Sequence, residues 1–248
     1  SYPNLNFIDN KEGFDKIINT NYHFYKKLQE GIAEHLGYKN AKWIKPILNI
    51  KPKERPIKNK YVVINIHSTT QMKYWNHPDG KKVRDTSPYW NELCRILRKN
   101  GLTPVVVEKE ELWGVNPYYN GLPKKSVKRV GMPLEEVVNY IQHAEFFIGL
   151  SSGLAWIAHG LGKKTAIIAN FTNEDHEIPL DENNYKRITK KDVCHGCWNN
   201  PKYDLMSIYR DKNDTWDECP EHKDTKREFE CHTSITPEQV FNEIEDWI

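Results

Sequence analysis

Four cysteines in the C-terminal part of the chain have the grouping of a metal site. Cys194 and Cys197 form a C-x-x-C knuckle, and Cys219 and Cys231 follow in a charged, turn-rich stretch with few apolar residues. Four thiolates suit a tetrahedral structural metal, either zinc or a single iron. Disulfide bonds are the alternative. Nearby histidines are further candidate ligands: His195, His222 and His232.

A second group is the turn Ser151-Ser152-Gly153, which lies between the apolar run 146–150 and a helix-like stretch that begins near Leu154. Serine hydroxyls donate hydrogen bonds, glycine lets the backbone approach a ligand, and a helix N-terminus favours an anion. The turn therefore predicts a phosphate or diphosphate site. The alternative is structural, with Ser152 as a helix cap and Gly153 as a packing residue.

A third group is the loop 67–80, which follows the apolar run 61–66. A lysine neutralises phosphate charge, and Ser and Thr hydroxyls hold the same oxygens. Because ligands of open parallel sheets bind outside the carboxyl ends of the strands, we expect this loop to face the Ser-Ser-Gly turn. A solvated loop with one stray lysine is the alternative. The polar residues concerned are His67, Ser68, Thr69, Thr70, Lys73 and His77.

The elements that must position these groups alternate between strands and helices from Lys60 onward. The alternation predicts an α/β fold in which helices cover both faces of a parallel sheet. Cys94 lies in an apolar helical stripe, which indicates buried packing. Residues 1–56 indicate a helical segment and a Pro- and Lys-rich linker. The strands are expected at 61–66, 103–108, 145–150 and 165–170, and the helices at 87–101, 133–144 and 151–162.

Charge and hydropathy exclude several classes of protein. The net charge is +2, with 36 Lys and Arg against 34 Asp and Glu, so the total charge gives no reason to expect nucleic acid. The basic runs 124–129 and 186–191, together with the cysteines, leave a zinc-ribbon nucleic-acid binder as a weaker alternative. No apolar run reaches the roughly 20 residues of a membrane span, and the N-terminus lacks a signal-peptide pattern. We therefore expect a soluble, cytoplasmic protein.

Four segments, in order, resemble the autotransporter heptosyltransferases. These bacterial enzymes have the GT-B fold, are related to the lipopolysaccharide heptosyltransferases of glycosyltransferase family 9, and transfer heptose from ADP-heptose to protein serines. The resemblance covers about residues 57–248. The segments are "HSTTQMKYWNHPDG", "GMPLEEVVNYIQHAEFFIGLSSGLAWIAHGLGKKTAIIANFT", "CHGCWNN" and "REFECHTSITPEQV".

The resemblance implies that residues 57–248 are the C-terminal, nucleotide-sugar-binding lobe, a Rossmann-like parallel sheet with a metal segment at 194–231. Lys73 would contact the donor diphosphate and relieve its charge as it departs, without a divalent cation, since the sequence has no Asp-x-Asp. Glu108 would lie near the ribose and Met132 near the adenine. The four cysteines would hold iron, with zinc as the alternative. The remaining donor-site residues would be His67, Ser68, Thr69, Ser151, Ser152, Gly153 and Leu154.

Two departures from the related enzymes bear on function. The lipopolysaccharide enzymes carry Asp-Thr-Gly-x-x-His where this chain has Ser151, Ser152, Gly153 and Trp156, a form that matches the autotransporter branch and its protein acceptors. A GT-B enzyme also needs a second lobe with an acidic base, and residues 1–56 are too few to form it. An N-terminal lobe from elsewhere, or a homo-oligomer, is one interpretation. A non-catalytic nucleotide-sugar-binding or interaction module is the other.

Overall fold

The computed structural model describes residues 27–38, 40–68, 73–78, 87–115, 118–179, 184–200, 202–203 and 218–248. The chain divides into two compact units, Ser1–Ile44 and Lys45–Ile248. In the first unit, helix α1 spans Leu28–His35. The Gln29 side chain bonds both backbone groups of Ile44, with its amide 2.9 Å from the carbonyl oxygen and its oxygen 2.6 Å from the nitrogen. The predicted boundary near residue 56 remains a prediction.

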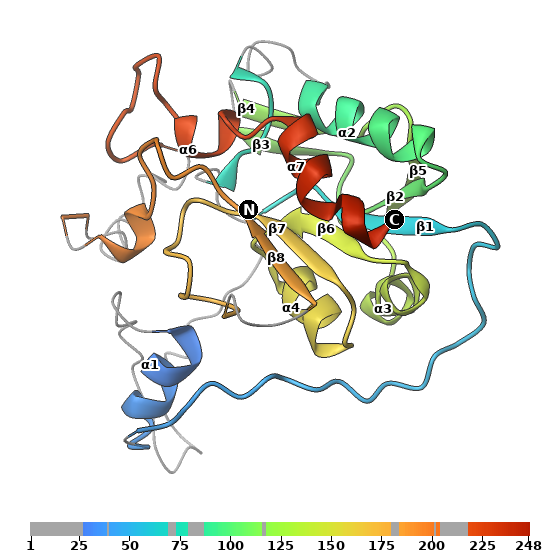
Figure 1. Ribbon diagram of the computed structural model, residues 1–248, viewed down its shortest axis with the longest axis horizontal. Helices are drawn as coiled ribbons and strands as arrows, with labels where there is room; N and C mark the ends of the chain where they lie inside the picture. Colours follow the sequence, from blue (N-terminus) through green and yellow to red (C-terminus); the bar gives the residue numbers. More distant parts are fainter. Residues whose placement is uncertain are drawn as a thin grey trace. The chain divides into compact units, whose positions relative to one another are not determined.

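A six-stranded parallel sheet forms the centre of the second unit (Figure 1). Its order is β5-β2-β1-β6-β7-β8, so the chain builds outward in one direction from β1 and then returns to β6 to build in the other. This order is that of a doubly wound nucleotide-binding fold, whose switch point lies between β1 and β6. The predicted α/β class is confirmed. The strands are β1 (Tyr61–Asn65), β2 (Thr103–Glu108), β5 (Val127–Val130), β6 (Phe147–Leu150), β7 (Thr165–Ile168) and β8 (Tyr185–Ile188).

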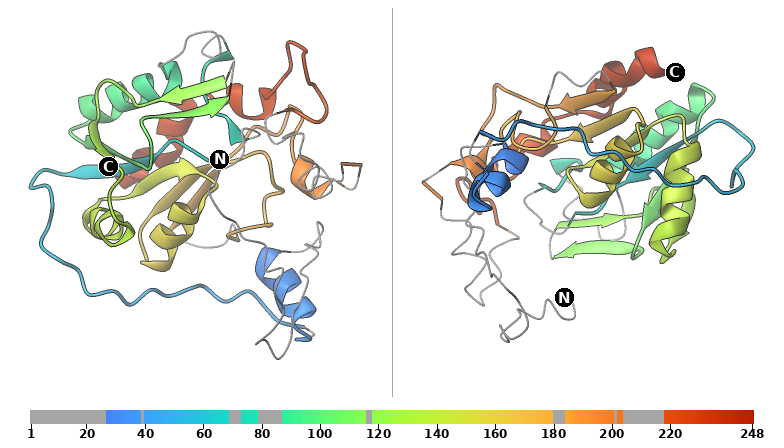
Figure 2. Two further views of the ribbon diagram at one scale, coloured as in Figure 1. Left: turned by 180° about the vertical axis from the view of Figure 1, so that it is seen from behind. Right: turned by 90° about the horizontal axis from the view of Figure 1, so that it is seen from below.

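Helices cover both faces of this sheet, as the alternating pattern predicted (Figure 2). Helices α2 (Pro88–Lys99) and α7 (Pro237–Ile244) pack on one face, and α3 (Leu134–His143) and α4 (Gly153–Gly160) pack on the other. Cys94 is fully buried in the core beneath α2, where burial raises the pKa of its thiol to about 12. No helix in the described residues is long and apolar enough to cross a bilayer.

Several elements were missed because their sequences lack long apolar runs. The stretch 109–132, predicted as a loop, contains the antiparallel hairpin β3 (Leu112–Val115) and β4 (Tyr118–Gly121) as well as β5. The basic run 124–129 contributes to β5, and the basic run 186–191 contributes to β8. These two strands are the edges of the sheet, where lysine and arginine discourage pairing with other chains. Their charge thus has an explanation that does not require nucleic acid.

The segment 45–59, predicted as a linker, runs as an extended strap along α3 and α4 (Figure 1). The Leu48 amide donates to the Gly160 carbonyl at 2.8 Å, and the Gln142 side chain donates to the Ile50 carbonyl at 2.7 Å. Asn139 pairs through its amide with the backbone of both Lys53 and Glu54. Side-chain bonds at intervals therefore satisfy a backbone that has no sheet partner.

Candidate functional site

The Ser-Ser-Gly turn lies at the switch point of the sheet, directly beside the end of β1. Strands β1 and β6 pair in register from Val63 with Phe147 to Asn65 with Gly149. The Ser152 hydroxyl donates to Asn65 Oδ1 at 2.9 Å and accepts from the Ala155 amide at 3.5 Å. Ser152 is therefore the N-cap of α4, as the structural alternative predicted, and it also links β6 to β1.

Gly153 has no packing role in the described residues. A Cβ built on it would meet no heavy atom within 4 Å, so the packing alternative for this glycine is not supported. The amides of Gly153 and Leu154 precede the first intrahelical bonds of α4, which run from Ala155 and Trp156 to the Ser152 carbonyl. Within the described residues, the start of α4 thus leaves two N–H groups without an intrahelical acceptor.

Lys73 joins the loop after β1 to this turn. Its ammonium donates to the Ser151 carbonyl at 2.8 Å and contacts the Ser151 hydroxyl at 3.2 Å. The adjacent Tyr74 and Trp75 are buried, and the Trp75 indole donates to the Ile235 carbonyl at 2.8 Å. Because these rings anchor the loop in the core, Lys73 is held at the carboxyl end of β6. Thr69 and Thr70 lie outside the described residues, and Ser68 is partly exposed.

Glu108 ends β2 and holds the end of β1. Its Oε1 accepts from the Asn65 side chain at 2.9 Å, from the His67 amide at 3.0 Å and, at shorter range, from the Ile66 amide. Its Oε2 lies 3.2 Å from Nδ1 of His67. The other ring nitrogen of His67 lies 2.8 Å from the Asn120 carbonyl on β4. Glu108, predicted to lie near a ribose, therefore fixes the backbone from which the Lys73 loop departs.

Met132 follows β5, and Leu154 is the second residue of α4. Both are partly buried against the core that α3 and α4 share. Met132 thus lies beyond the carboxyl end of β5, in line with the groups that follow β1, β2 and β6. All the described residues predicted for donor binding lie at this one edge of the sheet.

Sequence reasoning missed two charged residues beneath Ser151. Glu177 Oε1 accepts a hydrogen bond from the Ser151 hydroxyl, and Glu177 Oε2 lies 3.4 Å from the Arg187 guanidinium. Burial opposes the charge of Glu177, but Lys73, Arg187 and the Ser151 bond together lower its pKa below the ordinary value. Burial lowers the pKa of Lys73, and the Glu177 carboxylate acts in the opposite direction. No pattern around these single charges could have identified them.

Three of the four cysteines lie in or against one cluster with aromatic side chains. Cys197 and Cys219 are buried there, and Cys194 packs against the same cluster. Burial, followed by the thiols of Cys194 and Cys219, raises the pKa of Cys197 to about 12. Burial and the other three thiols likewise raise the pKa of Cys231. The aromatic members of the cluster are Tyr74, Tyr118, Phe171 and Phe229, with Trp198 and Tyr203 against it.

These thiols are close without forming a coordination shell. All five cysteines of the chain are free. No group of three or more His, Cys, Asp or Glu side chains in the described part of the chain is arranged to hold a metal ion. The candidate histidines have other contacts. His195 Nδ1 bonds the Val193 carbonyl, His222 faces Glu230 at 3.7 Å, and His232 Nε2 accepts from the Asn170 amide.

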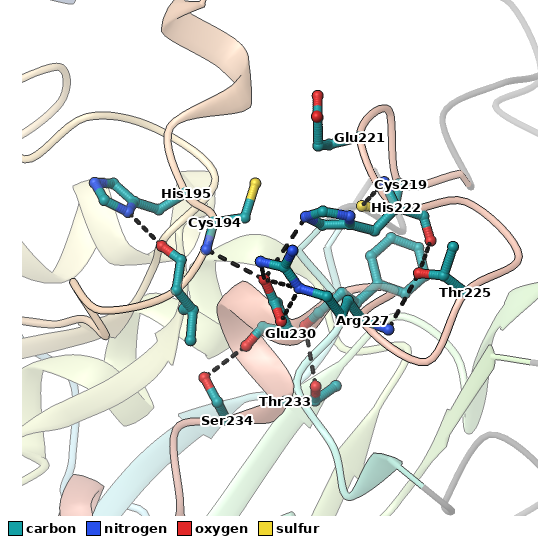
Figure 3. Close-up of polar contacts among 12 residues, drawn as sticks. Cys194, His195, Cys219, Glu221, His222, Thr225, Arg227, Glu230, Thr233 and Ser234 are labelled. Atoms are coloured by element: carbon teal, nitrogen blue, oxygen red, sulfur yellow. Dashed lines mark hydrogen bonds and ion pairs between the residues drawn. The ribbon is translucent and has the colours of Figure 1, made fainter.

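Two residues attach the cysteine segments to the rest of the fold. Figure 3 shows Glu230 between the Arg227 guanidinium and the Cys194 amide, which lies 3.3 Å from its carboxylate. Asn170, after β7, is 3% exposed. Its side chain donates to the carbonyls of Cys231 and Lys190 at 2.7 and 2.8 Å, and its carbonyl accepts from the Gly196 amide. Asn170 thus bonds both cysteine segments to the end of β7.

Replacing Glu108 with alanine should destabilise the protein. Three N–H groups at the end of β1 would lose their shared carboxylate, and the loss of such a charged partner costs about 1.5–3 kcal/mol. Denaturant unfolding would measure the change, with the exposed Glu110→Ala as the control. An unfolding free energy equal to that of the parent protein would contradict the clamp.

The chain was compared with known proteins. No protein-family model matches it. It is 33% identical to an autotransporter heptosyltransferase of Citrobacter rodentium over 223 residues, which cover 86% of this chain and 48% of that protein. It is also 33% identical to the autotransporter heptosyltransferase TibC of Escherichia coli over 208 residues, 46% of that protein. The chain spans about half the length of these curated relatives.

Solved structures that resemble this chain are also glycosyltransferases. The iron-containing, dodecameric heptosyltransferase TibC, in complex with ADP-D-β-D-heptose, matches with a TM-score of 0.74 and 29% identity, over 89% of this chain and 52% of TibC. A glycosyltransferase family 9 protein of Veillonella parvula matches with a TM-score of 0.51 at 12% identity, over 94% of this chain and 62% of that protein. The second match shows a shared fold alone.

Proposed function

The chain belongs to the autotransporter heptosyltransferase family, and we propose that it is the donor-binding lobe of a glycosyltransferase. The enzyme would transfer a sugar from an ADP-heptose-like donor to a protein hydroxyl. The observation that carries this proposal is the Lys73–Ser151 hydrogen bond, which brings a cation to the switch point of a sheet whose relative TibC has been solved with ADP-D-β-D-heptose.

The donor diphosphate would lie over the start of α4. Both serine hydroxyl protons are donated within the protein, Ser151 to Glu177 and Ser152 to Asn65. Phosphate oxygens would therefore bind the amides of Gly153 and Leu154 rather than the hydroxyls. An ammonium has three N–H donors, and Ser151 takes two of them from Lys73, so one remains for the diphosphate. Ser68 and Thr69 would complete this end of the site.

The nucleoside would lie toward β2 and β5. Met132 would contact the adenine, and the ribose would lie near the Glu108 and His67 pair. Because Glu108 Oε1 already accepts three N–H groups, its Oε2 is the oxygen that would receive a ribose hydroxyl. This end of the site thus depends on the same carboxylate that fixes the end of β1.

The chemical contribution of this lobe would be charge relief. When the sugar leaves for the acceptor, negative charge develops on the departing diphosphate, and Lys73 with the helix N-terminus would stabilise that charge. No divalent cation is needed for this step. The base that deprotonates the acceptor hydroxyl would come from an N-terminal lobe or from another copy of the chain. The relative TibC is a dodecamer. Without such a partner the lobe would bind the donor and transfer nothing.

The four cysteines would hold one structural metal, iron with zinc as the alternative. Support comes from the packing of Cys194, Cys197 and Cys219 in or against one cluster. These three thiols also raise the pKa of Cys231, and the relative TibC contains iron. Such a metal supplies cross-links between loops, because four thiolates leave no open position for chemistry. Ligation would require the four thiols to draw closer together than they lie here.

Lys73→Met should weaken ADP binding by about 1.5–3 kcal/mol, which corresponds to roughly 10- to 150-fold in Kd. The methionine keeps the unbranched stem of the side chain, one atom shorter, and removes its charge. Titration calorimetry with ADP would measure the effect, and Lys128→Met on the exposed edge strand β5 is the matched control. A folded Lys73→Met protein with parental affinity would exclude Lys73 from the donor site.

Gly153→Ala should separate stability from binding. The added methyl meets no protein atom within 4 Å, and alanine is about 1 kcal/mol more favourable than glycine within a helix. Thermal unfolding should therefore occur at the same or a higher temperature. ADP affinity should fall, because the methyl fills the space above the α4 amides. A loss of stability without a loss of ADP affinity would support a structural glycine instead.

The purified protein should carry about one iron or zinc per chain, because four thiolates make one closed tetrahedral site. Replacing any one of the four cysteines with serine should release the metal and destabilise the tail, since metal-binding energy is also folding energy here. Elemental analysis would identify the metal, and a reddish absorption would indicate iron. Cys94→Ala should retain the metal. Metal-free protein with two disulfides would refute the assignment.

A further inference from the structure

Three charged side chains from separate parts of the chain gather beneath the Ser-Ser-Gly turn. Lys73 follows β1, Glu177 follows β7, and Arg187 lies on β8. The Arg187 side chain is 0% exposed and that of Glu177 is 11% exposed. Two cations and one anion leave a single net positive charge in this group. Charge removed from water is costly unless a partner balances it, so this group favours an anion.

A continuous chain of hydrogen bonds orients these groups. The Arg187 guanidinium donates to the carbonyl and the hydroxyl of Thr172, both at 2.7 Å. The Thr172 hydroxyl in turn donates to Glu177 Oε2 at 3.2 Å. With Oε2 fixed in this way, Glu177 Oε1 accepts a hydrogen bond from the Ser151 hydroxyl. The orientation of the carboxylate is therefore set by β8 and by the segment after β7.

The Ser151 hydroxyl transmits that orientation to Lys73. Because its proton is donated to Glu177, its oxygen lone pairs face the Lys73 ammonium at 3.2 Å. The Ser151 carbonyl supplies a second acceptor at 2.8 Å. Glu177 thus fixes the direction of the hydroxyl that Lys73 meets, and its negative charge stabilises the ammonium.

Stability alone does not account for such a group. Buried ion pairs contribute little net stability, since apolar side chains of similar size often replace them without loss. The same segment offers a contrast, because Glu174 pairs with Lys191 at 2.6 Å on the surface, where both side chains are exposed by 39% or more. Glu177 differs from Glu174 in being connected to the predicted donor site.

We propose that Glu177 is a positioning residue of the donor site, which acts through Ser151 to hold the Lys73 ammonium against the diphosphate, with Arg187 fixing Glu177 through Thr172. The inference rests on the proposed donor-binding function. In this proposal, the diphosphate balances the one positive charge that remains when Glu177 is counted against Lys73 and Arg187. Arg187 and Glu177 touch neither the sugar nor the phosphates, and they act through Ser151 and Lys73.

The proposal makes ADP binding depend on pH in a defined direction. Without the Glu177 carboxylate, burial and the nearby Arg187 charge lower the pKa of Lys73 further. Binding requires the protonated ammonium, so the variant should lose ADP as the pH rises, at a pH where the parent protein still binds. His232 is also near Lys73. Its Nε2 accepts a hydrogen bond from the Asn170 amide at 3.1 Å, so this nitrogen carries no proton and the ring is neutral.

The test is ADP calorimetry from pH 6 to pH 9 on the full chain, with Glu177→Gln, Lys73→Met, the double variant, and Glu174→Gln as the matched surface control. Glu177→Gln should weaken ADP binding about tenfold at pH 8, the order expected for a lost partner of a charged group, and less at pH 6. In the Lys73→Met background the same substitution should have almost no further effect, because coupled residues are not additive.

The outcomes separate this inference from the proposed function. If the parent protein does not bind ADP, or binds it no better than Lys73→Met does, the proposed function fails. If Lys73→Met weakens binding but Glu177→Gln does not, or acts equally in both backgrounds without a pH dependence, the positioning role is refuted. If Glu177→Gln does not fold, Ser151→Ala tests the same connection. It keeps the carbonyl for Lys73 and the Glu177 charge but removes the hydroxyl link, so it should weaken ADP binding to a similar extent at every pH, and parental affinity would overturn the proposal.

Discussion

The parallel pairing of β1 with β6 is the contact on which the candidate site depends. The chain builds β1, β2 and β5 in one direction and then crosses back, so the ends of β1 and β6 meet although about 80 residues separate them. Asn65, at the end of β1, links this strand to both of its neighbours. Its side chain donates to Glu108 on β2 and accepts from Ser152 after β6.

The carboxyl edge of the sheet concentrates buried charge that the rest of the core avoids. Both helix-covered layers are apolar, whereas the strand ends carry Glu108, Glu177, Arg187 and Lys73. Each carboxylate accepts several hydrogen bonds, which offsets the cost of taking it out of water. These bonds also give the edge a defined geometry, because Glu177 is oriented by Ser151 after β6, by Thr172 after β7 and by Arg187 on β8. A site for an anionic ligand benefits from such orientation before the ligand arrives.

The cysteine segments are part of this same edge rather than a separate domain. Asn170, immediately after β7, bonds the knuckle through Gly196 and the last cysteine through the Cys231 carbonyl. Tyr74, adjacent to Lys73, packs in the aromatic cluster with Cys197 and Cys219. Ligation of the cysteines would therefore support the loop that carries Lys73. Through this packing, the proposed structural metal would be linked to the proposed donor site without any chemistry at the metal.

The sequence alone determined the α/β class, the central strands with their helices, and the facing of Lys73 toward Ser151. Local periodicity records which face of an element is buried, and parallel strands bring their carboxyl ends to one edge. Only the tertiary structure placed Glu177 and Arg187 beneath Ser151, and only it showed that the basic runs contribute to the edge strands β5 and β8. A single charged residue has no sequence pattern of its own, so its contacts are fixed by the distant strands that become its neighbours.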